Sequence, residues 1–189
     1  MRPDIEQAIK AFGNKKTQPN KKELKAVENM LWEDETVLYI ADTVLKVIAD
    51  GKKKKEENLA GVCVLTSKRF IQHKNEYKLL GIGVGGETAE TIALDRIDSV
   101  NAVNTIAFNH VQFHAMTKSY SILCHDKKEM KMLHQVFEKA IQDYSMQKNA
   151  PAAASDPLAQ IKQLSELRDA GVISEKEFEE KKAALLSRI

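Results

Sequence analysis

The chain has 189 residues, 43% of them hydrophobic and 30% charged, so it can hold one ordinary domain with appendages or two small domains. Its 29 basic and 27 acidic residues give a formal charge of +2, a near balance that argues against a dedicated duplex-DNA-binding protein. No apolar run approaches the ~18 residues that a membrane span needs, and the N-terminus lacks the apolar segment of a secretory signal. We therefore expect a cytoplasmic protein in which Cys63 and Cys124 are buried thiols.

Two short amphipathic helices are predicted within residues 1–34. Apolar residues at helical spacing define the first helix, and Asn20 can cap the second. The two apolar stripes consist of Ile5, Ala8, Ile9 and Phe12, and of Leu24, Val27, Met30 and Leu31. Each stripe needs a surface to cover it, and that surface can belong to the same chain or to a neighbouring subunit.

From residue 36 to residue 125 the pattern is that of β-strands. A turn is predicted over 51–58 and a tight hairpin at Ser67-Lys68. No helical segment separates the strands, which excludes a βαβ architecture on pattern. The seven expected strands are 36–48, 59–66, 69–74, 90–94, 99–106, 110–115 and 119–125.

A long amphipathic helix follows the last strand. Asp126 and Glu129 form a capping pair at its start, and we expect its apolar face to pack on the sheet. That face consists of Met130, Leu133, Phe137, Ala140, Ile141 and Tyr144. Residues 148–155, rich in alanine and without periodicity, are predicted to be a linker.

Residues 156–189 are predicted to form a helical hairpin. Asp156 and Pro157 begin the first helix, Gly171 ends it, and Ser174 with Glu177 forms a capping box for the second. Two short helices cannot bury their apolar faces alone, so the hairpin must dock on its own chain, on a copy or on a partner. The residues expected at this assembly surface are Leu158, Ile161, Leu164, Leu167, Ile173, Phe178, Leu185 and Leu186.

The order of elements between residues 35 and 147 resembles the pleckstrin-homology (PH) fold. Leu65, Thr66 and Arg69 form the L-T-x-x-R signature of bacterial PH domains of the YokE-like kind, and Ile97 and Val100 lie in a matching strand pair. The resemblance implies an α+β fold, in which a bent, seven-stranded antiparallel barrel is plugged by its C-terminal helix. The N-terminal helices are outside this resemblance.

The C-terminal hairpin resembles the short C-terminal domain called SHOCT. The matching residues are Asp156, Pro157, Leu158, Leu164, Leu167, Gly171, Ile173, Ser174, Glu177, Phe178, Lys181, Lys182 and Leu185. This resemblance implies a role in homo-oligomerisation or in docking a partner protein. Together the two resemblances favour a non-enzymatic binding or assembly protein.

The glycines Gly81, Gly83 and Gly86 have the G-x-G-x-x-G spacing of dinucleotide-binding folds. Such folds need a helix that begins at the glycines, whereas Thr88, Thr91 and the residues around them favour a strand. We therefore interpret the glycines as part of the connection between the third and fourth expected strands, and we expect no cofactor.

A run of lysines offers an alternative function. In a PH fold it would lie in the first loop of the open end, where related domains bind phosphorylated headgroups, and other loops of that end would add further cations. The expected anionic site, for a phosphorylated ligand or a membrane surface, consists of Lys52, Lys53, Lys54, Lys55, Lys74, Lys78 and Lys118. Glu56 and Glu57 reduce the local charge, so a solvated hairpin tip is the competing interpretation.

Other chemistries have weaker support in the sequence. His110 and His114 would share a strand face about 13 Å apart, too far for one metal ion. Asp95 and Asp98 have no evident catalytic partner. Nucleic-acid binding through Lys181, Lys182 and Arg188 is weak because four glutamates crowd the same helix.

Overall fold

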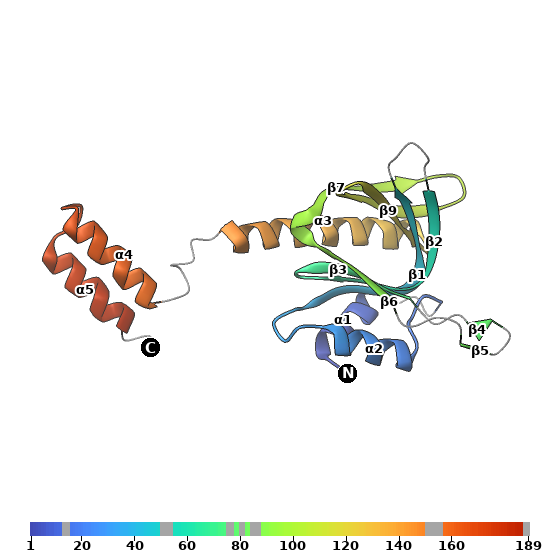
Figure 1. The fold of residues 1–189 in the computed structure, drawn as a ribbon, viewed down its shortest axis with the longest axis horizontal. Helices are drawn as coiled ribbons and strands as arrows, with labels where there is room; N and C mark the ends of the chain where they lie inside the picture. Colours follow the sequence, from blue (N-terminus) through green and yellow to red (C-terminus); the bar gives the residue numbers. More distant parts are fainter. Residues whose placement is uncertain are drawn as a thin grey trace. The chain divides into compact units, whose positions relative to one another are not determined.

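The computed structural model describes residues 1–12, 16–49, 55–74, 78–79, 82–83, 88–149 and 157–186. They divide into two compact units, Met1–Ser145 and Met146–Ile189, and each unit is described by itself. The first holds a seven-stranded antiparallel sheet with helices on both faces, and the second holds a pair of helices (Figure 1). None of the helices in the described part of the chain is both long and apolar enough to cross a bilayer.

The main sheet has the strand order β6-β3-β2-β1-β9-β8-β7, and neighbouring strands are antiparallel. The long strand β1 pairs with β2 along its whole length and with β9 over its second half, so it joins a four-stranded part to a three-stranded part. The strands are β1 (Val37–Ala49), β2 (Lys55–Thr66), β3 (Arg69–Lys74), β6 (Thr88–Ala93), β7 (Ile97–Asn104), β8 (Asn109–Ala115) and β9 (Lys118–Cys124). This curled sheet, closed by a C-terminal helix, confirms the predicted α+β, PH-like fold.

Several expected strand boundaries were wrong, including the start of the strand predicted over 90–94, which begins at Thr88. Residues 55–58, predicted to lie in a turn, begin β2, because Lys55 through Asn58 pair in register with the end of β1. The strand predicted over 99–106 begins earlier, at Ile97, and ends at Asn104, because Thr105 and the three residues after it form the turn into β8. At residues 55–58, cross-strand pairing outweighed the local preference of a charged segment for a turn.

The glycine-rich segment lies between β3 and β6, which pair antiparallel. It contains a two-stranded ladder of β4 (Lys78–Leu79) and β5 (Ile82–Gly83), while Gly81 and Gly86 lie outside the described residues. The prediction that these glycines belong to a connection between two antiparallel strands is confirmed.

The concave face of the sheet packs against helix α3 (Lys127–Asn149) (Figure 1). Asp126 caps this helix by accepting a hydrogen bond from the Glu129 amide at 2.8 Å, and Glu129 accepts from the His125 amide at 2.7 Å. Phe113 lies at the centre of the core, 5.0 Å from Phe70 and 5.2 Å from Phe137 between ring centroids. The four most buried residues of the helical face are Met130, Leu133, Phe137 and Ala140.

The opposite, outer face of the sheet is partly covered by α1 (Pro3–Phe12) and α2 (Lys21–Met30). The predicted cap is present: Asn20 accepts from the Glu23 amide at 3.1 Å, and Glu23 accepts from the Asn20 amide at 2.7 Å. The two helices bury a second apolar cluster against β1, β2 and β3. This cluster consists of Ile5, Ala8, Leu24, Val27, Val37, Ile40, Val62, Val64 and Ile71. The N-terminal helices therefore pack within their own chain.

Both cysteines are buried, as the sequence predicted. Burial, followed by the nearby thiol of Cys124, raises the pKa of Cys63 well above its ordinary value. Burial is also the main cause that raises the pKa of Cys124 to about 12. Neither thiol has the character of a reactive cysteine.

Candidate functional site

The second unit, residues 146–189, contains helix α4 (Pro157–Asp169) and helix α5 (Glu175–Leu186). Gly171 ends α4 with φ +73°, a left-handed conformation that suits glycine. Ser174 caps α5: its hydroxyl accepts from the Glu177 amide at 3.3 Å, and the Glu177 carboxylate accepts from the Ser174 amide at 2.8 Å. Asp156, the expected cap of α4, lies outside the described residues.

Phe178 holds the hairpin together. It is buried, and two cations flank its ring: the guanidinium carbon of Arg168 lies 4.7 Å from the centroid and the Lys182 Nζ lies 5.3 Å from it. Arg168 also forms an ion pair with Glu175 across the turn at 3.3 Å. The hairpin thus has one aromatic anchor and a rim of charges.

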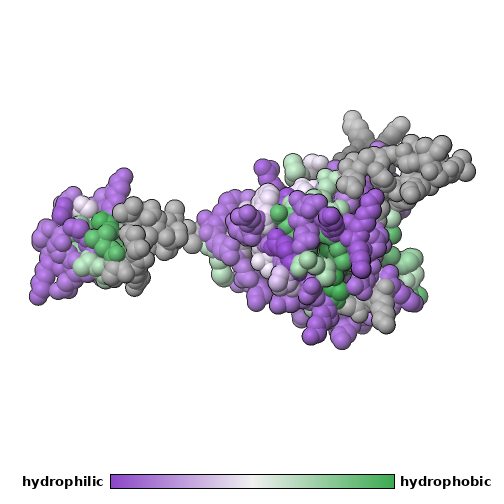
Figure 2. All heavy atoms as spheres, turned by 90° about the horizontal axis from the view of Figure 1, so that it is seen from below, coloured by the Kyte–Doolittle hydropathy of each residue, from purple (hydrophilic) through white to green (hydrophobic). Residues whose placement is uncertain are grey.

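Apart from Phe178, the predicted assembly residues with described side chains are not fully buried within the hairpin. Leu167 and Leu186 are 42% and 48% exposed, and Val172, which was not among the predicted residues, is 68% exposed. Figure 2 shows hydrophobic surface on the hairpin bordered by hydrophilic side chains. Of the other predicted residues, the side chain of Leu158 is not described, and the half-buried ones are Ile161, Leu164, Ile173 and Leu185.

The predicted anionic site is only partly described. Lys52, Lys53 and Lys54 lie outside the described residues, and Lys78 lies in β4 without a described side chain. The other three lysines lie at strand ends: Lys55 at the start of β2, Lys74 at the end of β3 and Lys118 at the start of β9. We call this end of the curled sheet its mouth.

Glutamates lie among these lysines. Lys55 forms an ion pair with Glu57 at 2.7 Å, and Lys118 forms one with Glu90 at 3.1 Å. Hydrogen bonding and charge from Lys55 are the largest causes that lower the pKa of Glu57, and the charges of Lys74 and Lys118 also lower it. The structure therefore brings three of the predicted lysines close to shared carboxylates.

The L-T-x-x-R signature residues have a structural role. Arg69 donates from Nε and Nη2 to the two carboxylate oxygens of Glu35 at 2.8 and 2.9 Å, and the Thr66 hydroxyl donates to the same carboxylate at 2.7 Å. Arg69 Nη2 also donates to the Met30 carbonyl at 2.7 Å, and the guanidinium stacks 4.0 Å from the Trp32 ring centroid. We call these residues the Glu35–Arg69 network; it fastens the end of α2 to the β2–β3 hairpin.

Glu35 is the buried centre of this network, with 1% of its surface exposed. Burial raises the pKa of its carboxyl, but the hydrogen bonds from Arg69 and Thr66 and the charge of Arg69 outweigh that effect. The resulting pKa lies below its ordinary value of 4.5. The carboxylate is therefore charged in the folded protein at neutral pH, and it depends on Arg69 for compensation.

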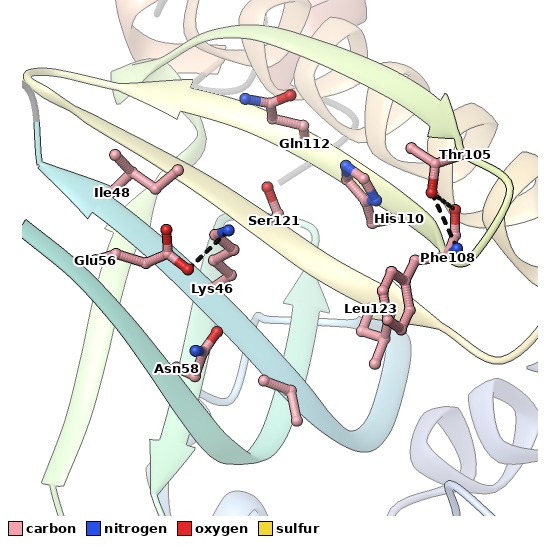
Figure 3. A pocket seen from close by; sticks show the side chains of 11 residues that line it. Lys46, Ile48, Glu56, Asn58, Thr105, Phe108, His110, Gln112, Ser121 and Leu123 are labelled. Atoms are coloured by element: carbon pink, nitrogen blue, oxygen red, sulfur yellow. Dashed lines mark hydrogen bonds and ion pairs between the residues drawn. The ribbon is translucent and has the colours of Figure 1, made fainter. Parts of the chain in front are cut away.

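A hollow that sequence reasoning missed lies on the outer face of β2, β1, β9 and β8, beside the area covered by α1 and α2 (Figure 3). We call it the outer groove. Its volume is about 520 Å³. Its lining residues are Val44, Lys46, Ile48, Glu56, Asn58, Thr105, Phe108, His110, Gln112, Ser121 and Leu123. The sequence places most of them at the solvent-facing positions of strands, and nothing in it indicates that four strands bring them together.

His110 lies in this groove, and His114 shares its strand face, as predicted, while Val111, Phe113 and Ala115 are buried on the other face. Burial, and then the charge of Lys46, lowers the pKa of His110. Among the described residues, no three histidine, cysteine, aspartate or glutamate side chains gather to form a metal site.

Comparison with known families identifies the tail. Residues 159–186 match the profile of SHOCT, the short C-terminal domain, so the chain carries a SHOCT domain at its C-terminus. No curated protein sequence matches the chain significantly.

Several solved structures are similar to the chain. The N-terminal PH domain of human ARAP2 is 12% identical, with 60% of this chain and 88% of that chain covered and a TM-score of 0.38. A structure of the Vav1 exchange factor, described for the role of its PH and C1 domains, is 13% identical, with 82% and 39% covered and a TM-score of 0.38. A chain of the 8S snRNP assembly intermediate is 10% identical, with 57% and 83% covered and a TM-score of 0.40. These similarities carry no conclusion about function.

Proposed function

We propose that the protein is a non-enzymatic assembly protein, in which the PH-like unit is the scaffold and the SHOCT hairpin binds another protein chain. The observation that carries this proposal is the apolar surface of the hairpin. Leu167, Val172 and Leu186 are large side chains that remain exposed while only Phe178 has a buried side chain among the described residues of α4 and α5.

The size of the hairpin supports the same conclusion. Helices α4 and α5 have 13 and 12 residues, and isolated helices shorter than about 12–15 residues are marginal in water. A surface that covers the exposed leucines would stabilise both helices. We propose a second copy of the hairpin as the first such surface, because like hairpins offer matching apolar faces between charged rims.

Light scattering coupled to size-exclusion chromatography tests this proposal on the full chain. We expect the wild type to have the mass of an oligomer, and Leu167→Ser with Leu186→Ser to shift that mass toward the monomer. Lys162→Ser is the matched control, since Lys162 is an exposed polar residue of α4 and its loss should leave the mass unchanged. A monomeric wild type would end the homo-oligomer proposal and leave docking to a different protein as the remaining form of this function.

A second candidate function is the binding of a phosphorylated ligand or an anionic membrane surface at the mouth of the sheet. The observation in its favour is that Lys74 and Lys118 both lie close enough to lower the pKa of Glu57, so three strands contribute cations to one place. Against it, Glu57 and Glu90 already pair with Lys55 and Lys118.

Vesicle co-sedimentation distinguishes the two interpretations of these lysines. We expect binding to vesicles that contain phosphatidylserine, with weaker binding at high salt and after Lys74→Gln with Lys118→Gln. Vesicles of phosphatidylcholine alone are the control for the lipid surface, and inorganic phosphate as a competitor reports a free-anion site. If the wild type binds neither vesicles nor phosphate, the lysines are a solvated strand end.

A further inference from the structure

The outer groove has the size of a ligand-binding site, and it is distinct from the hairpin surface and from the lysines at the strand ends. Its volume of about 520 Å³ lies within the roughly 300–1,000 Å³ that is typical of small-molecule pockets. All four contributing strands belong to the main sheet, so its floor is held by the backbone ladder.

Register across the sheet explains the chemistry of the floor. Asn58 on β2, Lys46 on β1, Ser121 on β9 and Gln112 on β8 lie directly opposite one another and form one polar row. Two residues further along the strands, at about 7 Å, β1 and β9 carry the apolar Val44 and Leu123, and His110 on β8 lies opposite Leu123. The groove therefore holds a row of hydrogen-bonding groups beside apolar side chains.

Much of the hydrogen-bonding capacity of the polar row is unused. In the part of the chain that the structure describes, the side chains of Asn58, Gln112 and Ser121 make no hydrogen bond to protein groups. Each of these groups can donate and accept at the same time. A hydroxyl on a ligand does the same, whereas the oxygens of a phosphate mainly accept and an ammonium only donates.

The charges of the groove cancel. Lys46 and Glu56 form an ion pair at 2.8 Å, and the lowered pKa of His110 leaves its imidazole neutral at neutral pH. A neutral imidazole also offers one donor and one acceptor. This balance disfavours a strongly anionic or cationic ligand and favours an uncharged one.

Phe108 forms the apolar end of the groove, next to Leu123 (Figure 3). It is 59% exposed, yet its turn is fixed: the Phe108 amide donates to the Thr105 hydroxyl at 3.0 Å, and the Thr105 amide donates to the Phe108 carbonyl at 2.9 Å. An exposed aromatic ring on a fixed turn is a surface on which the C–H face of a ring ligand can stack.

From these observations we propose that the outer groove binds an uncharged, hydroxyl-rich ring compound, of the size of a mono- or disaccharide. Its hydroxyls bond to the row formed by Asn58, Ser121 and Gln112. Its C–H face lies against Phe108 and Leu123.

Titrations of the ¹⁵N-labelled full chain with maltose, cellobiose and N,N′-diacetylchitobiose, followed by NMR, test this proposal. We expect saturable shifts of groove amides with at least one of these sugars. Gln112→Ala and Phe108→Ala should each weaken binding about 3- to 10-fold, the effect of losing one net contact. The matched control is Asn101→Ala, because Asn101 lies opposite Gln112 on β7 but outside the groove lining.

The remaining arms of the titration use adenosine, a short alanine peptide and inorganic phosphate. Tighter binding of any of these than of the best sugar would overturn the proposed ligand class. The proposal also fails if no sugar gives saturable shifts, or if Gln112→Ala binds as the wild type does. All substituted side chains lie on the outer surface, so unchanged unfolding midpoints are expected and show that the variants fold.

Discussion

Replacing Arg69 by alanine removes the only cation of the Glu35–Arg69 network that contacts the buried carboxylate within the described residues. The change leaves Glu35 buried and without its charge partner, and it also deprives the Met30 carbonyl of a donor. Breaking one side of a buried ion pair costs about 3–5 kcal/mol. That is a large share of the roughly 5–15 kcal/mol by which a typical domain is stable.

The effect should depend on pH. The pKa of Glu35 is lowered in the folded wild type, so the network stabilises the fold fully above the ordinary value of 4.5, and this contribution is lost as the pH falls through the folded value. In Arg69→Ala the carboxylate keeps the hydrogen bonds from Thr66 and the Trp32 amide but loses its charge partner, so its pKa rises and Glu35 takes up a proton more easily. The difference between the two proteins should therefore be large near neutral pH and shrink in acid.

Urea unfolding of the full chain at about pH 7 and about pH 4 measures the stability lost in Arg69→Ala and how that loss depends on pH. A difference in the protonation of Glu35 becomes a difference in the free energy of unfolding. The single tryptophan, Trp32, lies in the network and reports its loss, while circular dichroism reports the sheet. Lys55→Ala is the matched control: its ion pair with Glu57 is at the surface, so little change is expected.

A double replacement of Glu35 and Arg69 by leucine tests whether the stability lost in Arg69→Ala comes from the unpaired charge of Glu35. Because both charges leave together, we expect it to restore much of the stability that Arg69→Ala loses. A loss below about 1 kcal/mol for Arg69→Ala, typical of an ordinary substitution, would refute the reasoning. An equal loss at both pH values would also refute it.

Three further predictions concern two glycines and the two cysteines. Gly61→Ala should destabilise the sheet by at least about 2 kcal/mol in urea unfolding, because its Cβ would lie 2.2 Å from the His73 carbonyl oxygen at a backbone φ of +147°. Gly171→Ala should weaken the α4–α5 hairpin by about 1 kcal/mol, measured by amide exchange, because its φ is +73° in open space. Cys63 and Cys124 should resist a thiol reagent at neutral pH until urea unfolds the protein; fast labelling of the folded chain would contradict their burial.

Much of this structure could be predicted from local sequence. The caps at Asn20, Asp126 and Ser174 and the helix end at Gly171 depend on residues within a few positions of one another. Alternation along β8 likewise predicted that His110 and His114 share one face, because a strand exposes successive residues to opposite faces. The SHOCT hairpin was predicted for the same reason, since its signals are contained in one short segment.

What the sequence did not determine depends on distant pairings. Glu35 is buried beside Arg69 because the β2–β3 hairpin meets the end of α2, and the N-terminal helices cover their own sheet because β1, β2 and β3 present an apolar outer face. The outer groove exists because antiparallel register aligns Asn58, Lys46, Ser121 and Gln112 across four strands. Local patterns specify which face a side chain takes, but only the folded sheet decides which side chains become neighbours.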